Sequence, residues 1–145
     1  MADGSPDSLG TPLGFDQSDG LAFFAARSDE MIRSYISFNL VWDSLFALVY
    51  GLLYISWLLV LCRPVAHKTR VVNLSPALQV LFDRLENIVV AFLANQFVAE
   101  GSLSPMGVQT ASIFSISKWS LSVAVLVMVV AGIVFRIAQA VSKRA

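Results

Sequence analysis

Two long runs of apolar residues constrain the fold of this chain more than any other feature of its sequence. The first run covers residues 36–61 and the second covers residues 108–137. A helix needs roughly 20 predominantly apolar residues to cross a hydrocarbon core that is about 30 Å thick. Both runs exceed that length, so the sequence predicts that each is a transmembrane helix.

The composition of the 145 residues agrees with a protein of the membrane. Hydrophobic residues make up 57% of the chain and charged residues 14%, whereas soluble domains have roughly 45–50% apolar and about 25% charged residues. The ten basic residues balance the ten acidic ones, and they form no basic stripe of the kind that binds nucleic acid. We therefore expect a lipid bilayer, and no nucleic acid, as a partner.

A third span is predicted over residues 76–98, between the two apolar runs. Ser75 precedes Pro76, a pair that often starts a helix because serine caps the helix and proline occupies its first position. The second half of this segment is apolar, whereas its first half carries three charged residues. A helix lying on the membrane surface is therefore the alternative.

The distribution of Lys and Arg favours three spans. Basic residues near the ends of spans mark the cytoplasmic side of a membrane, and three spans place the loop after the first span on the same side as the C-terminus. Both places are basic, whereas the loop at residues 99–107 has no Lys or Arg. The C-terminus is therefore predicted to be cytoplasmic and the N-terminus to lie outside. The basic residues concerned are Arg63, Lys68, Arg70, Arg136, Lys143 and Arg144.

The region before the first span divides into two parts. Residues 1–20 are rich in Gly, Ser, Pro and Asp, and because such a segment buries little apolar surface, we expect a disordered acidic tail. Residues 21–35 mix apolar and charged positions at helical spacing, which predicts an amphipathic interfacial helix at the membrane surface. The predicted fold is all-α, with residues 21–145 forming one multi-pass membrane domain of about three transmembrane helices.

Polar residues inside the predicted spans are the candidate site residues. An ionisable side chain at the centre of a spanning helix costs about 2.5–3.5 kcal/mol, so such residues usually pair inside the bundle and often serve a function. Helical spacing places them on one stripe of each span, and we expect the three stripes to face one another. The candidates are Asp43, Tyr50, Asp83, Glu86, Asn87, Ser115 and Lys118.

Charge and depth together predict a network around Lys118. Asp43 and Lys118 lie toward the outer ends of their spans, and at about 1.5 Å of rise per residue they can share a level. We expect the Lys118 ammonium to be held by Asp43 and by Glu86, which reaches them through Asn87 or a water molecule. Two alternatives stay open: a network that only sets helix register, and a Lys118 side chain that extends to the outer membrane interface.

Two motifs within the spans resemble a known group of proteins. Residues 83–87 read Asp-Arg-Leu-Glu-Asn, which fits D-x-x-E-N, and residues 115–118 read Ser-Ile-Ser-Lys, which fits [S/T]-x-x-K. With Asp43 upstream, at the start of a stripe that ends in Tyr50, they resemble a group of small bacterial integral membrane proteins without an assigned activity. The likeness covers about residues 25–125 and implies an architecture rather than a function. Members often have an additional N-terminal span, where this chain has a polar tail.

The function that these features favour is that of a small membrane-embedded binding or accessory protein, acting in a homo-oligomer or a larger membrane complex. One alternative is an enzyme that acts on a lipid or isoprenoid, with Asp83 or Glu86 as general base. Another is a subunit of a transporter or proton relay. His67 and Cys62 are the only histidine and cysteine, so we expect no cofactor and no zinc or haem site, and we assign no catalytic residue.

Overall fold

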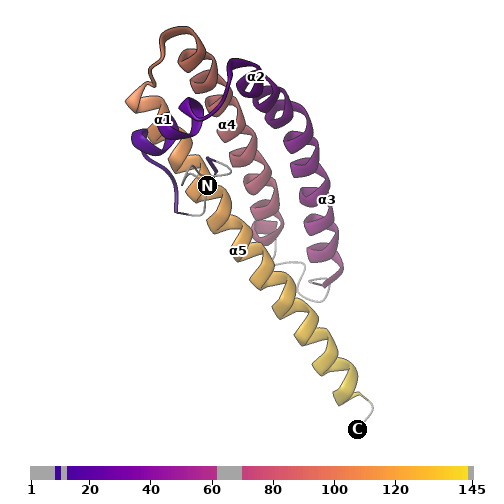
Figure 1. Cartoon of the computed structure of the whole chain (residues 1–145). Coiled ribbons are helices and arrows are strands. Elements are labelled where there is room, and N and C mark those ends of the chain that lie inside the picture. Colours follow the sequence, from indigo (N-terminus) through magenta and orange to yellow (C-terminus); the bar gives the residue numbers. More distant parts are fainter. Residues whose placement is uncertain (1–8, 11–12, 62–69, 144–145) are drawn as a thin grey trace, which may run out of the picture.

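The structure of the protein, a computed structural model, describes residues 9–10, 13–61 and 70–143. All regular secondary structure in these ranges is helical, which confirms the all-α prediction. The helices are α1 (Gln17–Ala25), α2 (Asp29–Phe38), the short π-helix η1 (Asn39–Asp43), α3 (Ser44–Leu61), α4 (Arg70–Glu100) and α5 (Pro105–Ser142). Because α2, η1 and α3 follow one another without a break, they form one helical rod (Figure 1).

Two helical stretches in the described part of the chain are long and apolar enough to cross a membrane, Asp29–Leu61 and Pro105–Ser142. They contain the two apolar runs of the sequence. Most of their apolar side chains point outward: only 11% of the most apolar window in Pro105–Ser142 is buried. Large outward-facing apolar surfaces mark contact with a partner or a membrane, because they are unfavourable in water.

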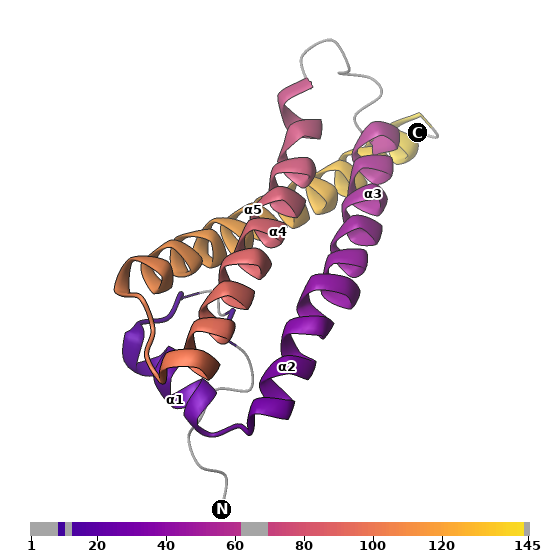
Figure 2. The same ribbon diagram turned by 90° about the horizontal axis from the view of Figure 1, so that it is seen from above.

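The rod and α5 both pack against α4. Gly51 of α3 allows a close approach to α4, because a Cβ atom there would collide with Cγ2 of Val80. Arg136 of α5 joins the end of α3: its Nε and Nη2 donate to the carbonyl oxygens of Leu61 and Val60 at 3.3 Å and 2.7 Å. These carbonyls belong to the last turn of a helix, where acceptors lack partners within the helix. The C-terminal parts of α3 and α5 therefore lie at the same end of the molecule (Figure 2).

Buried side chains form three layers along the bundle. On α5 they pass from Val108 and Ala111, through the polar Ser115, to Val125 and Val129. A polar layer thus lies between two apolar ones, and its groups must find partners within the protein. The first apolar layer consists of Leu9, Phe23, Phe24, Ile32, Val90, Leu93, Ala94, Leu103, Val108 and Ala111, and the second of Leu58, Val125 and Val129.

The prediction of a disordered tail over residues 1–20 is wrong where the structure describes this segment. α1 begins at Gln17, and the Leu9 side chain is only 1% exposed in the first apolar layer. The Asp16 carboxylate accepts from the Asp19 amide, while the Asp19 carboxylate accepts from the Asp16 amide, a reciprocal cap that stabilises the helix start. The polar composition of residues 1–20 did not indicate this order, because an average over the segment hides the few apolar residues that pack in the core.

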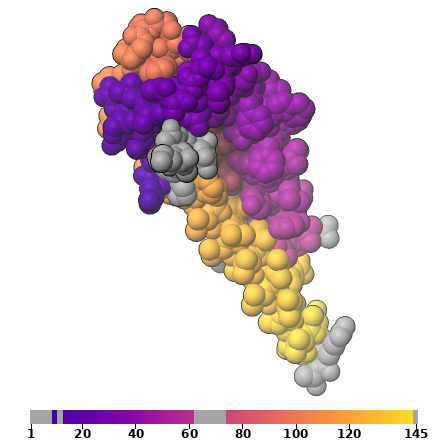
Figure 3. Space-filling view, in the orientation of Figure 1, coloured from indigo at the N-terminus to yellow at the C-terminus, as the bar shows by residue number. Residues whose placement is uncertain are grey.

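The predicted single surface helix at residues 21–35 is also wrong, because these residues belong to two separate helices. α1 ends at Ala25, and α2 starts at Asp29, after Ser28 has capped it by accepting from the Met31 amide. Both helices contribute fully buried side chains to the first apolar layer. They therefore close one end of the bundle, where Figure 3 shows them gathered, instead of forming one helix that lies flat beside it.

The predicted helix start at Ser75-Pro76 is wrong as well. α4 begins at Arg70 and continues through Pro76, which lies buried inside the helix. Proline in a helix interior loses a hydrogen bond, and Pro76 is fully buried at the position where α4 comes close to Gly51 of α3. The predicted basic loop runs from Cys62 to about Asn73: its residues 62–69, with Cys62 and His67, lie outside the described residues, whereas residues 70–73 already belong to α4.

Candidate functional site

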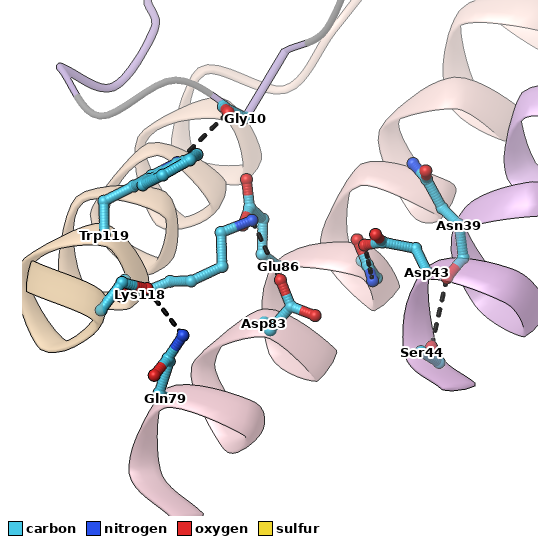
Figure 4. Close-up of polar contacts among 11 residues, drawn as sticks. Gly10, Asn39, Asp43, Ser44, Gln79, Asp83, Glu86, Lys118 and Trp119 are labelled. Carbon is cyan, nitrogen blue, oxygen red and sulfur yellow. Dashed lines mark hydrogen bonds and ion pairs between the residues drawn. The ribbon is translucent and has the colours of Figure 1, made fainter. Parts of the chain in front are cut away.

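The polar layer is built around Lys118 of α5, whose ammonium lies between two carboxylates of α4. Its Nζ is 3.0 Å from Oδ1 of Asp83 and 2.5 Å from Oε2 of Glu86. The two acidic side chains are 6% and 3% exposed and the lysine is 15% exposed. Residues three apart lie on the same helix face, so one face of α4 presents both carboxylates. Asp83, Glu86 and Lys118 are called the ion triad below (Figure 4).

Asp43 lies apart from Lys118, so the prediction that Asp43 and Glu86 hold the ammonium is wrong for one partner. The Asp43 carboxylate instead accepts a hydrogen bond of 2.9 Å from Nδ2 of Asn87. Asn87 follows Glu86 on α4 and therefore faces a neighbouring direction, toward the rod rather than toward α5. Asp83, one turn from Glu86, takes the place that the sequence had suggested for Asp43.

A π-helical turn at Asn39–Asp43 ends with this carboxylate. A π-turn widens the helix and often occurs at functional sites. The Ser44 hydroxyl donates to the Asn39 carbonyl oxygen at 3.1 Å and so bonds back across the turn. The apolar periodicity of the first span carries no signal for this turn.

Further polar contacts extend the layer along α4 and α5. Nε2 of Gln79 donates to the Ser122 hydroxyl at 2.7 Å, and that hydroxyl donates to the Lys118 carbonyl oxygen at 2.9 Å. Ser115 contributes a hydrogen bond to Glu86. Gln79 was missed in the sequence, although it lies four residues before Asp83, on the same stripe.

The N-terminal segment precedes α1, and the structure describes its residues 9–10 and 13–16. Of these, Gly10 covers one side of the ion triad. Nε1 of Trp119 donates to the Gly10 carbonyl oxygen at 3.3 Å, and a Cβ on Gly10 would lie 2.7 Å from Oε1 of Glu86 and 3.5 Å from Nζ of Lys118. Glycine is thus the residue that lets the backbone approach the charges so closely. Leu9 anchors this approach in the first apolar layer.

Two cavities flank the polar layer and share Asp43, Lys118 and Trp119 as lining residues. The first, of about 310 Å³, extends from Asp83 along the aromatic side chains of α3. The second, of about 430 Å³, lies toward Gly10 and Glu86. The candidate residues thus surround open space. Of the seven, Asp43, Tyr50, Asp83, Glu86, Asn87 and Lys118 each line a cavity, and Ser115 lines neither.

The charges around these cavities do not balance. The ion triad sets two carboxylates against one ammonium, and Asp43 adds a third carboxylate that has no ion pair among the described residues. Within those residues, no three His, Cys, Asp or Glu side chains are grouped so that they can hold a metal ion. The site is therefore acidic, aromatic and partly enclosed.

Comparison of the chain with protein families, with curated proteins and with solved structures finds no significant match in any of the three.

Proposed function

We propose that the chain crosses the membrane three times, through the rod, α4 and α5. α4 carries too many charged residues to be identified as a membrane span from its composition alone. Two of these residues, Asp83 and Glu86, nevertheless point into the bundle. Its outer face carries the exposed apolar residues Leu74, Leu81, Ile88 and Phe92. The exposed Arg84 donates to the Leu40 carbonyl oxygen at 3.3 Å. A helix with inward charges and an outward apolar face suits a span within a bundle.

The orientation is part of the same proposal. The end of α3 and the C-terminal part of α5 meet through Arg136, so these two helix ends, after which the sequence is basic, lie at one end of the molecule. By the rule that basic residues stay in the cytoplasm, that end is cytoplasmic. The N-terminal end, with α1 and the segment over the ion triad, then lies outside.

Within this topology, we propose that the protein is a membrane-embedded binding or accessory protein whose site is the pair of cavities beside the ion triad. One observation carries the proposal: buried charged groups line open space instead of being packed on all sides. A network that only fixed helix register would need no cavity beside it. Ligand sites typically combine apolar walls with a few convergent polar groups, which describes these cavities.

The outward apolar faces of the rod and α5 leave room for a homo-oligomer or a larger membrane complex, in which lipids or a second copy cover them. The resemblance of residues 83–87 and 115–118 to small bacterial integral membrane proteins belongs to the same proposal. Its support is that Lys118 of the second motif contacts both Asp83 and Glu86 of the first.

Native mass spectrometry of the full chain in mild detergent tests the proposed function, with wild type beside Glu86→Gln. Glu30→Gln is the matched control, because Glu30 is exposed and lies in α2, away from the cavities. A retained lipid or metabolite that disappears only in Glu86→Gln supports a binding site. Identical spectra of unliganded protein in all three would indicate that the network is purely structural.

A further inference from the structure

We propose that the first cavity binds a lipophilic organic cation: a protonated or quaternary amine, or a related onium group, carried on an apolar body. This inference rests on the proposed binding function and names the chemical class of the ligand. It follows from the charge of the cavity, from its aromatic wall and from its opening to the surroundings.

The charge of the first cavity favours a cationic ligand. Asp43, Asp83 and Lys118 line the first cavity together, and Lys118 is already engaged by two carboxylates. Asp43 has an amide partner in Asn87 but no cationic partner among the described residues. A buried or lipid-facing carboxylate without a counter-charge is costly, so a cation in the cavity supplies what the described residues do not.

The aromatic wall favours an organic cation. Phe46, Tyr50 and Tyr54 recur every four residues along α3 and line the cavity, with ring centroids 5.4 Å and 6.0 Å apart. Trp119 of α5 forms part of the lining as well. The faces of aromatic rings carry partial negative charge and attract cations, and groups of such rings recognise quaternary ammonium ligands.

The same geometry argues against other ligands. An anion, such as a phosphate head group, would approach the carboxylates of Asp43 and Asp83 and compete for an ammonium that is held on two sides. A bare metal ion needs several ligands in contact, and no group of three His, Cys, Asp or Glu side chains that could hold one occurs among the described residues. An onium ion disperses its charge over a larger volume and can be stabilised by one carboxylate and several rings.

Two further features fit such a ligand. Phe46 is 64% exposed and Trp119 is 39% exposed, so the cavity opens sideways, where an apolar body can extend into lipid. On its inner side lies Gln79, which is 4% exposed and whose Oε1 lacks a hydrogen-bond partner among the described residues. The N–H group of a protonated amine is a suitable donor to this oxygen.

Equilibrium dialysis with two matched ions tests the inference on the full chain in mild detergent. Tetraphenylphosphonium and tetraphenylborate have similar size and shape and opposite charge. We expect the wild type to bind the phosphonium and to bind the borate far more weakly. Asp43→Asn should weaken phosphonium binding at least about tenfold, because it removes the partner of a desolvated charge, whereas Glu30→Gln should leave it unchanged.

Tyr54→Leu provides a second variant that keeps every charge in case Asp43→Asn fails to fold. We expect it to weaken phosphonium binding by about fivefold, the size of a cation–π contribution. Equal affinity for the two ions, or unchanged phosphonium binding in both cavity variants, would overturn the inference. The proposed binding function would still stand if mass spectrometry found a neutral or anionic molecule that depends on Glu86, so the two failures are distinguishable.

Discussion

The two ends of the bundle are stabilised in different ways. At the end that holds α1, side chains from the N-terminal segment, from four helices and from the turn between α4 and α5 form an apolar layer of ten buried residues. At the other end, Leu58, Val125 and Val129 are the buried core of the second layer, and the outward side chains of α3 and α5 stay exposed. The first end resembles the interior of a soluble protein, whereas the second is suited to packing against lipid. The difference suggests that substitutions will have unequal effects along the same helices.

The largest effect is expected at the boundary between these ends, in the ion triad. Lys118→Met leaves Asp83 and Glu86 buried without their counter-charge, and breaking a buried ion pair from one side costs about 3–5 kcal/mol. We expect a large fall in the thermal unfolding temperature in mild detergent. Lys143→Met, at the exposed end of α5, is the control. Equal unfolding temperatures for the two variants would show that the triad contributes little to stability.

The contrast between the ends is tested directly by two truncations of the same residue type. Phe24 is 0% exposed in the first apolar layer, and Phe135 is 49% exposed on α5. Truncating a buried phenylalanine to alanine costs about 3–5 kcal/mol, so Phe24→Ala should lower the free energy of unfolding by close to this amount. Phe135→Ala should have a much smaller effect in detergent or lipid. Comparable losses would contradict the view that side chains buried within the protein contribute less to the stability of the second end.

A smaller effect is expected from displacing the N-terminal segment. A side chain on Gly10 would collide with the Glu86 carboxylate, and overpacking of this kind costs about 1–3 kcal/mol. Gly10→Val should break the hydrogen bond from Trp119 and raise the accessibility of that indole to acrylamide, measured with Trp42 and Trp57 replaced by Phe. Leu13→Ala, at a 93% exposed position of the same segment, is the control. Unchanged quenching in Gly10→Val would argue that the segment does not cover the triad.

The smallest effect is expected at the start of α1. Hydrogen bonds from the Ser18 hydroxyl and the Asp19 amide hold the pKa of Asp16 below its usual 3.8. Since the pKa in the folded state is lowered, the stabilisation is present above the unfolded pKa and is lost as pH falls through the folded one. Hydrogen exchange at the Asp19 amide should therefore accelerate slightly in acid below pH 3.8, relative to the α5 amides. Asp16→Ala should remove this pH dependence. If the exchange rate still changed with pH in this variant, another titrating group would be responsible.

Helical periodicity explains how much of the site was visible in the sequence. Asp83, Glu86 and Lys118 were identified because spacing of three or four residues defines one face of a helix, a property local to each segment. The burial of Asn87 and Ser115 follows from the same pattern. Gln79 lies on the same helix face as Asp83, and extending that polar stripe by one turn would have identified it.

The role of the N-terminal segment was not visible, because composition reports an average over many residues. Leu9 and Gly10 pack at specific positions against the bundle. In the sequence, the only indication of this is one apolar residue followed by a glycine. The continuation of α4 through Pro76 was equally hidden. Local propensity opposes a proline there, and the burial of Pro76 beside α3 depends on residues far away in the sequence.

By itself, the sequence determined that the chain is helical and that two of its segments are apolar enough for a membrane. It also determined that each polar stripe occupies one face of its helix, since these properties depend on neighbours within about one turn. Only the tertiary structure decided that Lys118 pairs with Asp83 and that Asp43 pairs with Asn87 instead. Such pairings depend on how far helices rotate and slide against one another. That arrangement is set by contacts between distant residues, and an ion pair or hydrogen bond forms only within a few ångströms.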